Sequence, residues 1–185
     1  KLLSHYDIKA TLRRYDAHAS EGVHEHILAD LEAGKRIALV SDAGTPGISD
    51  PGVFLVARVR ERLPEVTIEA IPGASALTAA LSIAGIAGNE FAFLGFVPQK
   101  KGRETFFREL DDYDMPVVFY ESVHRIMKTL ESLASTGGSV NRTVTVAREI
   151  TKMHEEVVQG SSEEVFTYFT EHPDHVRGEF VVIVA

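Results

Sequence analysis

The sequence contains no cysteine among its 185 residues. This absence excludes disulfide bonds and thiolate metal sites, and it is typical of proteins in a reducing compartment. No apolar run approaches the roughly eighteen residues that a transmembrane helix needs. We therefore predict a globular cytoplasmic protein without membrane contacts. Basic residues are also scarce: 19 Lys and Arg stand against 27 Asp and Glu, a net charge of −8. This balance argues against indiscriminate nucleic-acid binding but leaves room for a local basic patch.

Several common site patterns are missing as well. Neither GxxxxGK[ST] nor GxGxxG occurs, so Walker-type nucleotide binding and dinucleotide binding are poorly supported. The histidines have no metal-ligand spacing: His24 and His26 would point to different faces of a helix, and His172 and His175 flank a proline with no firm third ligand. We predict no metal site.

The most informative stretch is Ile37–Gly52, which reads IALVSDAGTPGISDPG. Its apolar start, Ile37–Val40, is short enough for a strand buried on both faces. Small residues and glycines follow, and they let a backbone approach a ligand closely. Asp50 and Pro51 then fit the N-cap and first position of a helix. An ordinary strand-to-helix turn would explain part of this pattern. The two aspartates, the glycines and the prolines favour a ligand site for a cationic or hydroxyl-rich molecule.

A second loop of this kind, IPGASALTAA, follows the predicted strand 67–71. Ser75 could simply cap the alanine-rich helix after it. Because two such loops at the carboxyl ends of parallel strands can meet at one crevice, we favour a shared small-molecule site.

Apolar spacing along the whole chain alternates between helical and strand-like patterns. The predicted helices are 1–6, 21–31, 53–63, 76–84, 103–110, 124–133 and 163–169, with a turn at Gly137–Gly138. The predicted strands are 8–15, 37–40, 67–71, 91–97, 117–120, 143–148, 155–159 and 179–184. The junction 85–89 separates two α/β domains, residues 1–88 and 89–185. We expect a mainly parallel sheet in the first and a mixed sheet in the second.

Long segments of the chain resemble, in order and spacing, the ribosomal RNA small-subunit methyltransferases of the tetrapyrrole-methylase family. These segments are LVSDAGTPGISDPG, IPGASALTAALSIAG, FLGFVPQKKGR, VVFYESVHRI, VAREITK and RGEFVVIV. In that family a strand, a Gly-Asn-Leu turn and an acidic segment precede the matching region. The resemblance therefore implies that the first domain lacks its first strand, which would lie before Lys1.

The resemblance implies two α/β domains of the tetrapyrrole-methylase type, with S-adenosylmethionine in the cleft between them, and a homodimer. The residues implied to bind the cofactor are Ser41, Asp42, Ala43, Gly44, Ile48, Ala74, Ser75, Tyr120, Glu121, Ala147, Arg148, Gly178 and Glu179. Carboxylates and backbone amides on small-residue loops suit the cofactor's cationic groups and ribose hydroxyls.

One stretch of this acidic chain, 96–108, is locally basic. A solvated turn and helix face would explain it. Because the resemblance implies a 16S ribosomal RNA substrate in the small ribosomal subunit, we favour contacts to RNA phosphates. The predicted RNA-binding residues are Lys100, Lys101, Arg103, Arg108 and Arg125.

The implied reaction is methylation of a cytidine ribose 2′-hydroxyl in the decoding region of 16S ribosomal RNA. Asp42, Asp50 and Glu121 are the candidate general bases, and the base could also lie in the segment expected before Lys1. Lys100 or Arg148 could stabilise the developing alkoxide. One alternative is C-methylation of a tetrapyrrole or corrinoid precursor. The other is a non-catalytic fragment that binds cofactor or RNA. With its first strand absent, the chain alone is expected to be weakly active or inactive.

Overall fold

The computed structural model describes residues 2–16, 19–135 and 142–185. The predicted turn at Gly137–Gly138, and Lys1 of the predicted first helix, lie outside these ranges. No helix in the described ranges combines the length and apolarity that crossing a bilayer requires. The chain divides into two compact units, Lys1–Gly73 and Ala74–Ala185. Each unit is described by itself.

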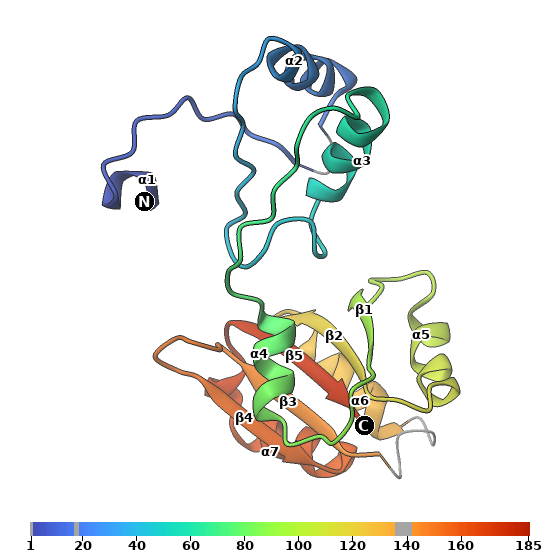
Figure 1. The fold of residues 1–185 in the computed structure, drawn as a ribbon. Coiled ribbons are helices and arrows are strands. Elements are labelled where there is room, and N and C mark those ends of the chain that lie inside the picture. Colours follow the sequence, from blue (N-terminus) through green and yellow to red (C-terminus); the bar gives the residue numbers. More distant parts are fainter. Residues whose placement is uncertain (1, 17–18, 136–141) are drawn as a thin grey trace. The chain divides into compact units, whose positions relative to one another are not determined.

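The second unit is built on a five-stranded mixed sheet with the order β1-β2-β5-β3-β4 (Figure 1). The strands are β1 (Ala92–Phe96), β2 (Val117–Ser122), β3 (Val144–Arg148), β4 (Glu156–Gly160) and β5 (Glu179–Val184). β1 runs parallel to β2, and every other neighbouring pair is antiparallel. The closing apolar run EFVVIV forms the central strand β5, as such a continuous run predicts. The mixed sheet expected for this part of the chain is confirmed.

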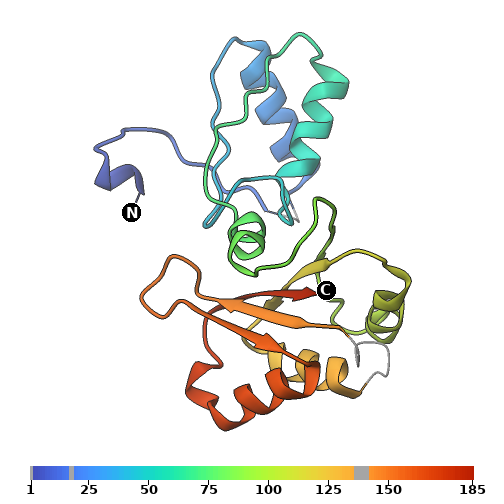
Figure 2. The same ribbon diagram turned by 60° about the horizontal axis from the view of Figure 1, so that its bottom comes forward.

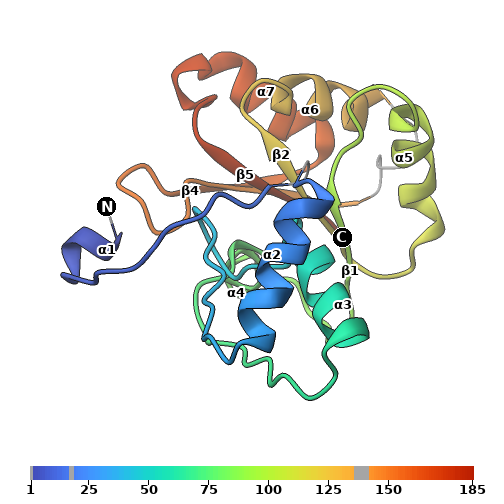
Figure 3. The ribbon, with the colours of Figure 1, turned by 90° about the horizontal axis from the view of Figure 1, so that it is seen from above.

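Helices cover both faces of this sheet, because residues alternate between the faces along each strand. One face carries α5 (Arg103–Glu109), η1 (Leu110–Asp112), α6 (Ile126–Ser135), α7 (Ser162–Glu171) and η3 (Pro173–His175), and the other carries α4 (Ala76–Ile83). Figure 3 shows α6 and α7 on the opposite side of the sheet from α4. Phe119 and Val182 face the first group of helices, whereas Val118 and Ile183 face α4. We call these two sides the α6–α7 face and the α4 face.

Helix α4 belongs to the second unit because of what it packs against. Ala80 and Ala84 are buried in the cluster formed with the α4 face of the sheet. The Gln159 side chain on β4 also donates a 2.8 Å hydrogen bond to the Ala84 carbonyl. The division between the units therefore precedes this helix. The predicted boundary at residues 88 and 89 instead assigned α4 to the first domain, because a small-residue helix does not reveal in sequence which sheet it covers.

The first unit contains the helices α1 (Leu2–His5), α2 (Glu21–Glu32) and α3 (Gly52–Arg62). α2 and α3 bury the cluster Ile27, Leu28, Leu55, Val59 and Leu63. Arg58 and Arg62 of α3 form ion pairs with Glu21 and Glu25 of α2. The helices predicted at 21–31 and 53–63 are confirmed to within one residue at each end.

The strands predicted in the first unit are not formed: its described residues contain no β-ladder. Segments 37–40 and 67–71 are nevertheless extended, and Figures 1 and 2 show them running alongside each other in the same direction. Leu39 packs against the α2–α3 cluster, whereas Val40 and Ile71 are exposed. The apolar pattern located these segments correctly, but a strand also requires paired backbone hydrogen bonds, which side-chain pattern alone does not specify.

Candidate functional site

The loop after residue 40 is held by one carboxylate. Asp50 Oδ1 accepts hydrogen bonds from the backbone N–H groups of Gly47 and Gly52, each at 2.8 Å. A Cβ at position 52 would lie 2.6 Å from Leu39 Cδ2 and 2.9 Å from Asp50 Oδ1, so a larger residue would displace the Asp50 carboxylate from its position. Helix α3 takes Pro51 as its N-cap, one residue later than predicted, while the Asp50 side chain serves its first residue. Asp50 thus has a structural role.

The part of this loop that remains open carries the predicted ligand-binding residues of the first unit. Ser41, Asp42, Ala43, Gly44 and Ile48 are all exposed. The Ser41 hydroxyl donates to the Ala43 carbonyl at 3.0 Å, and Gly44 has a left-handed φ of 74°. The backbone therefore folds into a compact turn with small side chains on its outer surface. The structure brings these residues together, next to the carboxyl end of segment 37–40.

Replacing Asp50 by alanine should destabilise this loop. Two partly buried N–H groups would lose their acceptor, which costs about 1–3 kcal/mol of unfolding free energy. Urea denaturation measures the change. The exposed Asp42→Ala change should stay within about 0.5 kcal/mol of the parent. Equal stability of the two variants would show that Asp50 does not anchor the loop.

In the second unit, the predicted cofactor residues lie at one edge of the sheet. In the strand register, Tyr120, Val181 and Ala147 lie side by side in one row across β2, β5 and β3. Glu121, Phe180 and Arg148 form the next row. Gly178 and Glu179 stand where β5 begins. Neighbouring rows point to opposite faces of the sheet. Tyr120 and Ala147 therefore face α4, whereas Glu121 and Arg148 face α6 and α7.

On the α4 face, Tyr120 is the centre of an aromatic group. Its ring contacts Phe93 and Phe96 edge-on, with centroid distances of 5.0 and 5.4 Å. Burial raises the pKa of the Tyr120 hydroxyl, and a hydrogen bond with the Leu77 backbone opposes part of that rise. The neutral phenol is therefore the form present at physiological pH. Ala74 and Ser75 precede α4, and Ser75 occupies the predicted N-cap position without a capping hydrogen bond from its side chain.

On the α6–α7 face, Glu121 is buried in a polar network. Its Oε2 accepts a 2.7 Å hydrogen bond from Thr129 and lies 3.6 Å from Arg103 Nη1. Its Oε1 lies 2.8 Å from Arg125 Nη2 and accepts the Ser122 N–H at 2.7 Å. Arg103 also donates to the Thr129 hydroxyl at 2.9 Å, and its guanidinium stacks on Phe107 at 5.0 Å. This carboxylate joins β2, α5 and α6.

The network corrects several predicted roles. Glu121 faces away from the Tyr120 row, and both its oxygens are engaged, so it is poorly placed to act as a general base. Arg103 is only 7% exposed and does not present its charge to solvent. Arg125 donates to the Val97 carbonyl at 2.8 Å as well as pairing with Glu121. A charge count does not say which way a side chain points, and both arginines are engaged within the second unit. Lys100, Lys101 and Arg108 are exposed, as an RNA-binding surface requires.

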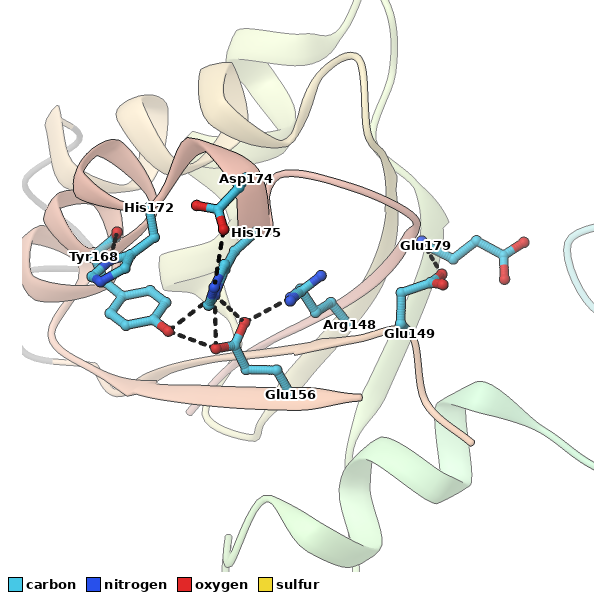
Figure 4. Close-up of polar contacts among 8 residues, drawn as sticks. All are labelled: Arg148, Glu149, Glu156, Tyr168, His172, Asp174, His175 and Glu179. Carbon is cyan, nitrogen blue, oxygen red and sulfur yellow. Dashed lines mark hydrogen bonds and ion pairs between the residues drawn. The ribbon is translucent and has the colours of Figure 1, made fainter. Parts of the chain in front are cut away.

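Arg148 lies in a second polar cluster on the α6–α7 face (Figure 4). Its Nε pairs with Glu156 at 2.6 Å. Glu156 also accepts the Tyr168 hydroxyl at 2.5 Å and lies 3.0 Å from His175 Nδ1. His172 stacks on the Tyr168 ring at 4.4 Å. Arg148 was predicted to contact the cofactor, but here it is buried and joins β3, β4 and α7. The partners Glu156, Tyr168 and His175 were missed because they are distant in sequence and form no motif.

The Glu156 carboxyl has a lowered pKa. Burial alone would raise it, but the hydrogen bonds from Tyr168 and Arg148 outweigh that effect. A lowered folded-state pKa contributes stability that is present above the unfolded value of about 4.3 and is lost as the pH falls through the folded value.

Glu156→Gln should therefore weaken the acid dependence of stability. We expect a smaller loss of unfolding free energy than in the parent when the pH falls from about 5 to about 3. Urea denaturation at each pH measures it, and the exposed Glu163→Gln change on α7 is the control, with the parent slope expected. If Glu156→Gln loses as much unfolding free energy on acidification as the parent, Glu156 is not the source of this pH dependence.

The start of β5 is fixed by a third charged group. Glu149 Oε1 accepts the Glu179 N–H at 3.0 Å, and Lys152 pairs with both carboxylates at 2.8 Å. Gly178 has a φ of 87°, and a Cβ there would lie 2.1 Å from Glu149 Oε1. Figure 4 shows Glu149 and Glu179 apart from the Glu156 group. Gly178 and the exposed carboxylate of Glu179 thus lie at the same sheet edge as Tyr120, while the Glu179 backbone is engaged by Glu149.

Comparisons with known proteins can now be set beside this geometry. The family described as Tetrapyrrole (Corrin/Porphyrin) Methylases matches residues 2–165. Proteins named ribosomal RNA small subunit methyltransferase I, from Synechocystis sp. and Xylella fastidiosa, are 43% and 42% identical over 100% of this chain. The chain spans 65% and 67% of their lengths, or about two thirds. The crystal structure of uroporphyrin-III C-methyl transferase from Thermus thermophilus complexed with S-adenyl homocysteine is similar in fold, with a TM-score of 0.58, 20% identity, and 89% and 72% of the two chains covered.

Proposed function

Because this chain belongs to the tetrapyrrole methylase family, among relatives named ribosomal RNA small subunit methyltransferase I, we propose that its full-length protein is a ribosomal RNA methyltransferase. The methyl donor is S-adenosylmethionine, and the acceptor is a cytidine ribose 2′-hydroxyl in the decoding region of 16S ribosomal RNA. The observation that carries the proposal is 42–43% identity along the whole chain with relatives of that name. The protein acts in the cytoplasm as a homodimer.

The residues of the two units fit this donor. In the first unit, the exposed turn from Ser41 to Gly44 offers a carboxylate, a hydroxyl and small side chains that admit close approach. In the second, Tyr120 offers a partly exposed flat ring on the α4 face, and the small side chain of Ala147 is buried in the same cluster. Gly178 and Glu179 lie at the same sheet edge, where the Glu179 carboxylate is exposed. Carboxylates suit ammonium and ribose hydroxyl groups, and flat apolar surfaces suit an adenine ring.

S-adenosylmethionine supplies a methyl group on a sulfonium, a strong donor that needs no metal. The work left to the chain is to align the acceptor oxygen and to receive its proton. Of the candidate bases, Asp50 already accepts two backbone N–H groups and Glu121 is enclosed by arginines. Asp42 is exposed, so we assign proton removal to its carboxylate. Lys100 stabilises the developing negative charge on the oxygen.

Transfer of radiolabelled methyl from the cofactor by the full-length protein tests the proposal. We expect label in small ribosomal subunits and, after digestion of the RNA to nucleosides, in 2′-O-methylcytidine. Uroporphyrinogen is the second acceptor, and it should stay unlabelled. Size-exclusion chromatography with light scattering tests the homodimer, which should run at twice the monomer mass.

Two outcomes would overturn the proposal in different ways. Label on uroporphyrinogen but not on RNA would assign the protein to tetrapyrrole methylation. Calorimetric binding of S-adenosylhomocysteine without transfer to either acceptor would assign it to cofactor binding without turnover.

A further inference from the structure

Strand β1 contains an irregularity that changes where one phenylalanine points. Phe93 is in register with Val118, but the next pair is Phe96 with Tyr120, so β1 uses three steps where β2 uses two. Gly95, between them, has a left-handed φ of 67°. One extra residue in one strand is the signature of a β-bulge, which is rare between parallel strands and is frequent beside active sites.

The bulge puts Phe96 on the α4 face. In a regular strand, residues 93 and 96 would point to opposite faces. Instead, both rings contact Tyr120 edge-on, while Leu94 and Val97 both pack into the core of the α6–α7 face. Without the bulge, the Phe96 ring would turn towards that core. The chain instead leaves it 51% exposed at the end of the strand.

The segment of chain that follows Phe96 carries two exposed positive charges, Lys100 and Lys101, in the turn before α5. Four residues of chain span at most about 14 Å, so Lys100 stays close to this ring. The buried Arg103 and the partly exposed Arg125 flank this turn, and both pair with Glu121. An exposed aromatic ring beside lysines on an ordered turn is the arrangement that binds single-stranded nucleic acid, by base stacking and phosphate contacts.

We propose that the Phe96 ring, supported edge-on by Tyr120, stacks on an unpaired base of the RNA substrate while Lys101 binds a neighbouring phosphate. This inference rests on the proposed function and adds a binding site for the nucleobase. The adenine of the cofactor could also stack on a ring, but the cofactor's carboxylate lies at the opposite end of the molecule from its adenine. In RNA, by contrast, every nucleotide carries a phosphate next to its base, which suits an aromatic ring followed by lysines. A base drawn out of its helix also exposes its ribose to the methylating site.

Fluorescence of a single-stranded RNA that contains 2-aminopurine tests the stacking directly. Stacking quenches this base, so the full-length protein should quench it, and Phe96→Leu should lose the quenching and weaken RNA binding about tenfold. Phe96→Trp keeps a ring and should bind within about twofold of the parent. Phe91→Leu is the matched control: it removes another exposed phenylalanine, 42% exposed and just before β1, and should change nothing.

Three results would overturn the proposal. They are unchanged quenching in Phe96→Leu, an equal loss in Phe91→Leu, and a loss of S-adenosylhomocysteine affinity in Phe96→Leu with RNA binding intact, which would assign the ring to the cofactor. Melting temperatures show that each variant is folded. If the parent protein methylates no ribosomal RNA but still quenches through Phe96, the proposed function fails and the stacking site stands. If it methylates RNA without quenching, the reverse holds.

Discussion

Glu121→Gln should lower the free energy of unfolding by about 3–5 kcal/mol, because it removes the only carboxylate that the network brings to two arginines. Arg103 and Glu121 are both buried, so water cannot solvate the Arg103 guanidinium once the carboxylate is gone. The amide also offers only one oxygen where Thr129, Ser122 and Arg125 now share two. Urea denaturation of the chain measures the change.

The control for this variant is Glu131→Gln, an exposed glutamate on α6, which should stay within about 0.5 kcal/mol of the parent. A second comparison isolates the charge pair. Arg103→Met removes one of the buried cations, so the double variant with Glu121→Gln should be more stable than the two separate losses predict, by about 1 kcal/mol or more. Additive losses would mean that the two side chains do not interact.

Much of the second unit was predictable because its signals are local. EFVVIV is apolar throughout and became the central strand β5. The strands predicted at 91–97 and 143–148 differ from β1 and β3 only at their ends. The bulge at Gly95 was not foreseen, although a glycine within a strand indicates one. In the first unit, the apolar segment 37–40 and the alternating segment 67–71 also have strand-like patterns but form no ladder. Strand pairing depends on neighbouring segments, which the pattern of one segment does not specify.

The candidate site was predictable by position but not by direction. Tyr120 and Glu121 are consecutive and were given one role, yet alternation along β2 sends them to opposite faces. The same holds for Ala147 and Arg148 on β3. A motif places residues at a strand end, and the strand then decides which of them meet a ligand. In the loop after Val40 the direction of the side chains was not in question, because all the residues predicted there to bind the cofactor are exposed.

Asp42→Asn should weaken S-adenosylhomocysteine binding by the full-length protein about tenfold to a hundredfold, because hydrogen bonds to a charged group are worth about 1.5–3 kcal/mol. Stability should change by less than about 0.5 kcal/mol, since the Asp42 side chain is exposed. Calorimetry measures the affinity, and methyl transfer to small ribosomal subunits should fall further still, because the amide cannot accept the ribose proton.

Comparison with a variant of the neighbouring Asp50 distinguishes an effect on ligand binding from an effect on stability. Asp50→Asn should reduce stability, because the amide is a weaker acceptor for the Gly47 and Gly52 N–H groups, and it should affect ligand binding only as far as the loop loosens. The two aspartates share one loop and one chemistry but differ in exposure. If Asp42→Asn destabilises the fold and leaves cofactor affinity intact, the exposed turn is not the binding surface, and the assignment of Asp42 as the base falls with it.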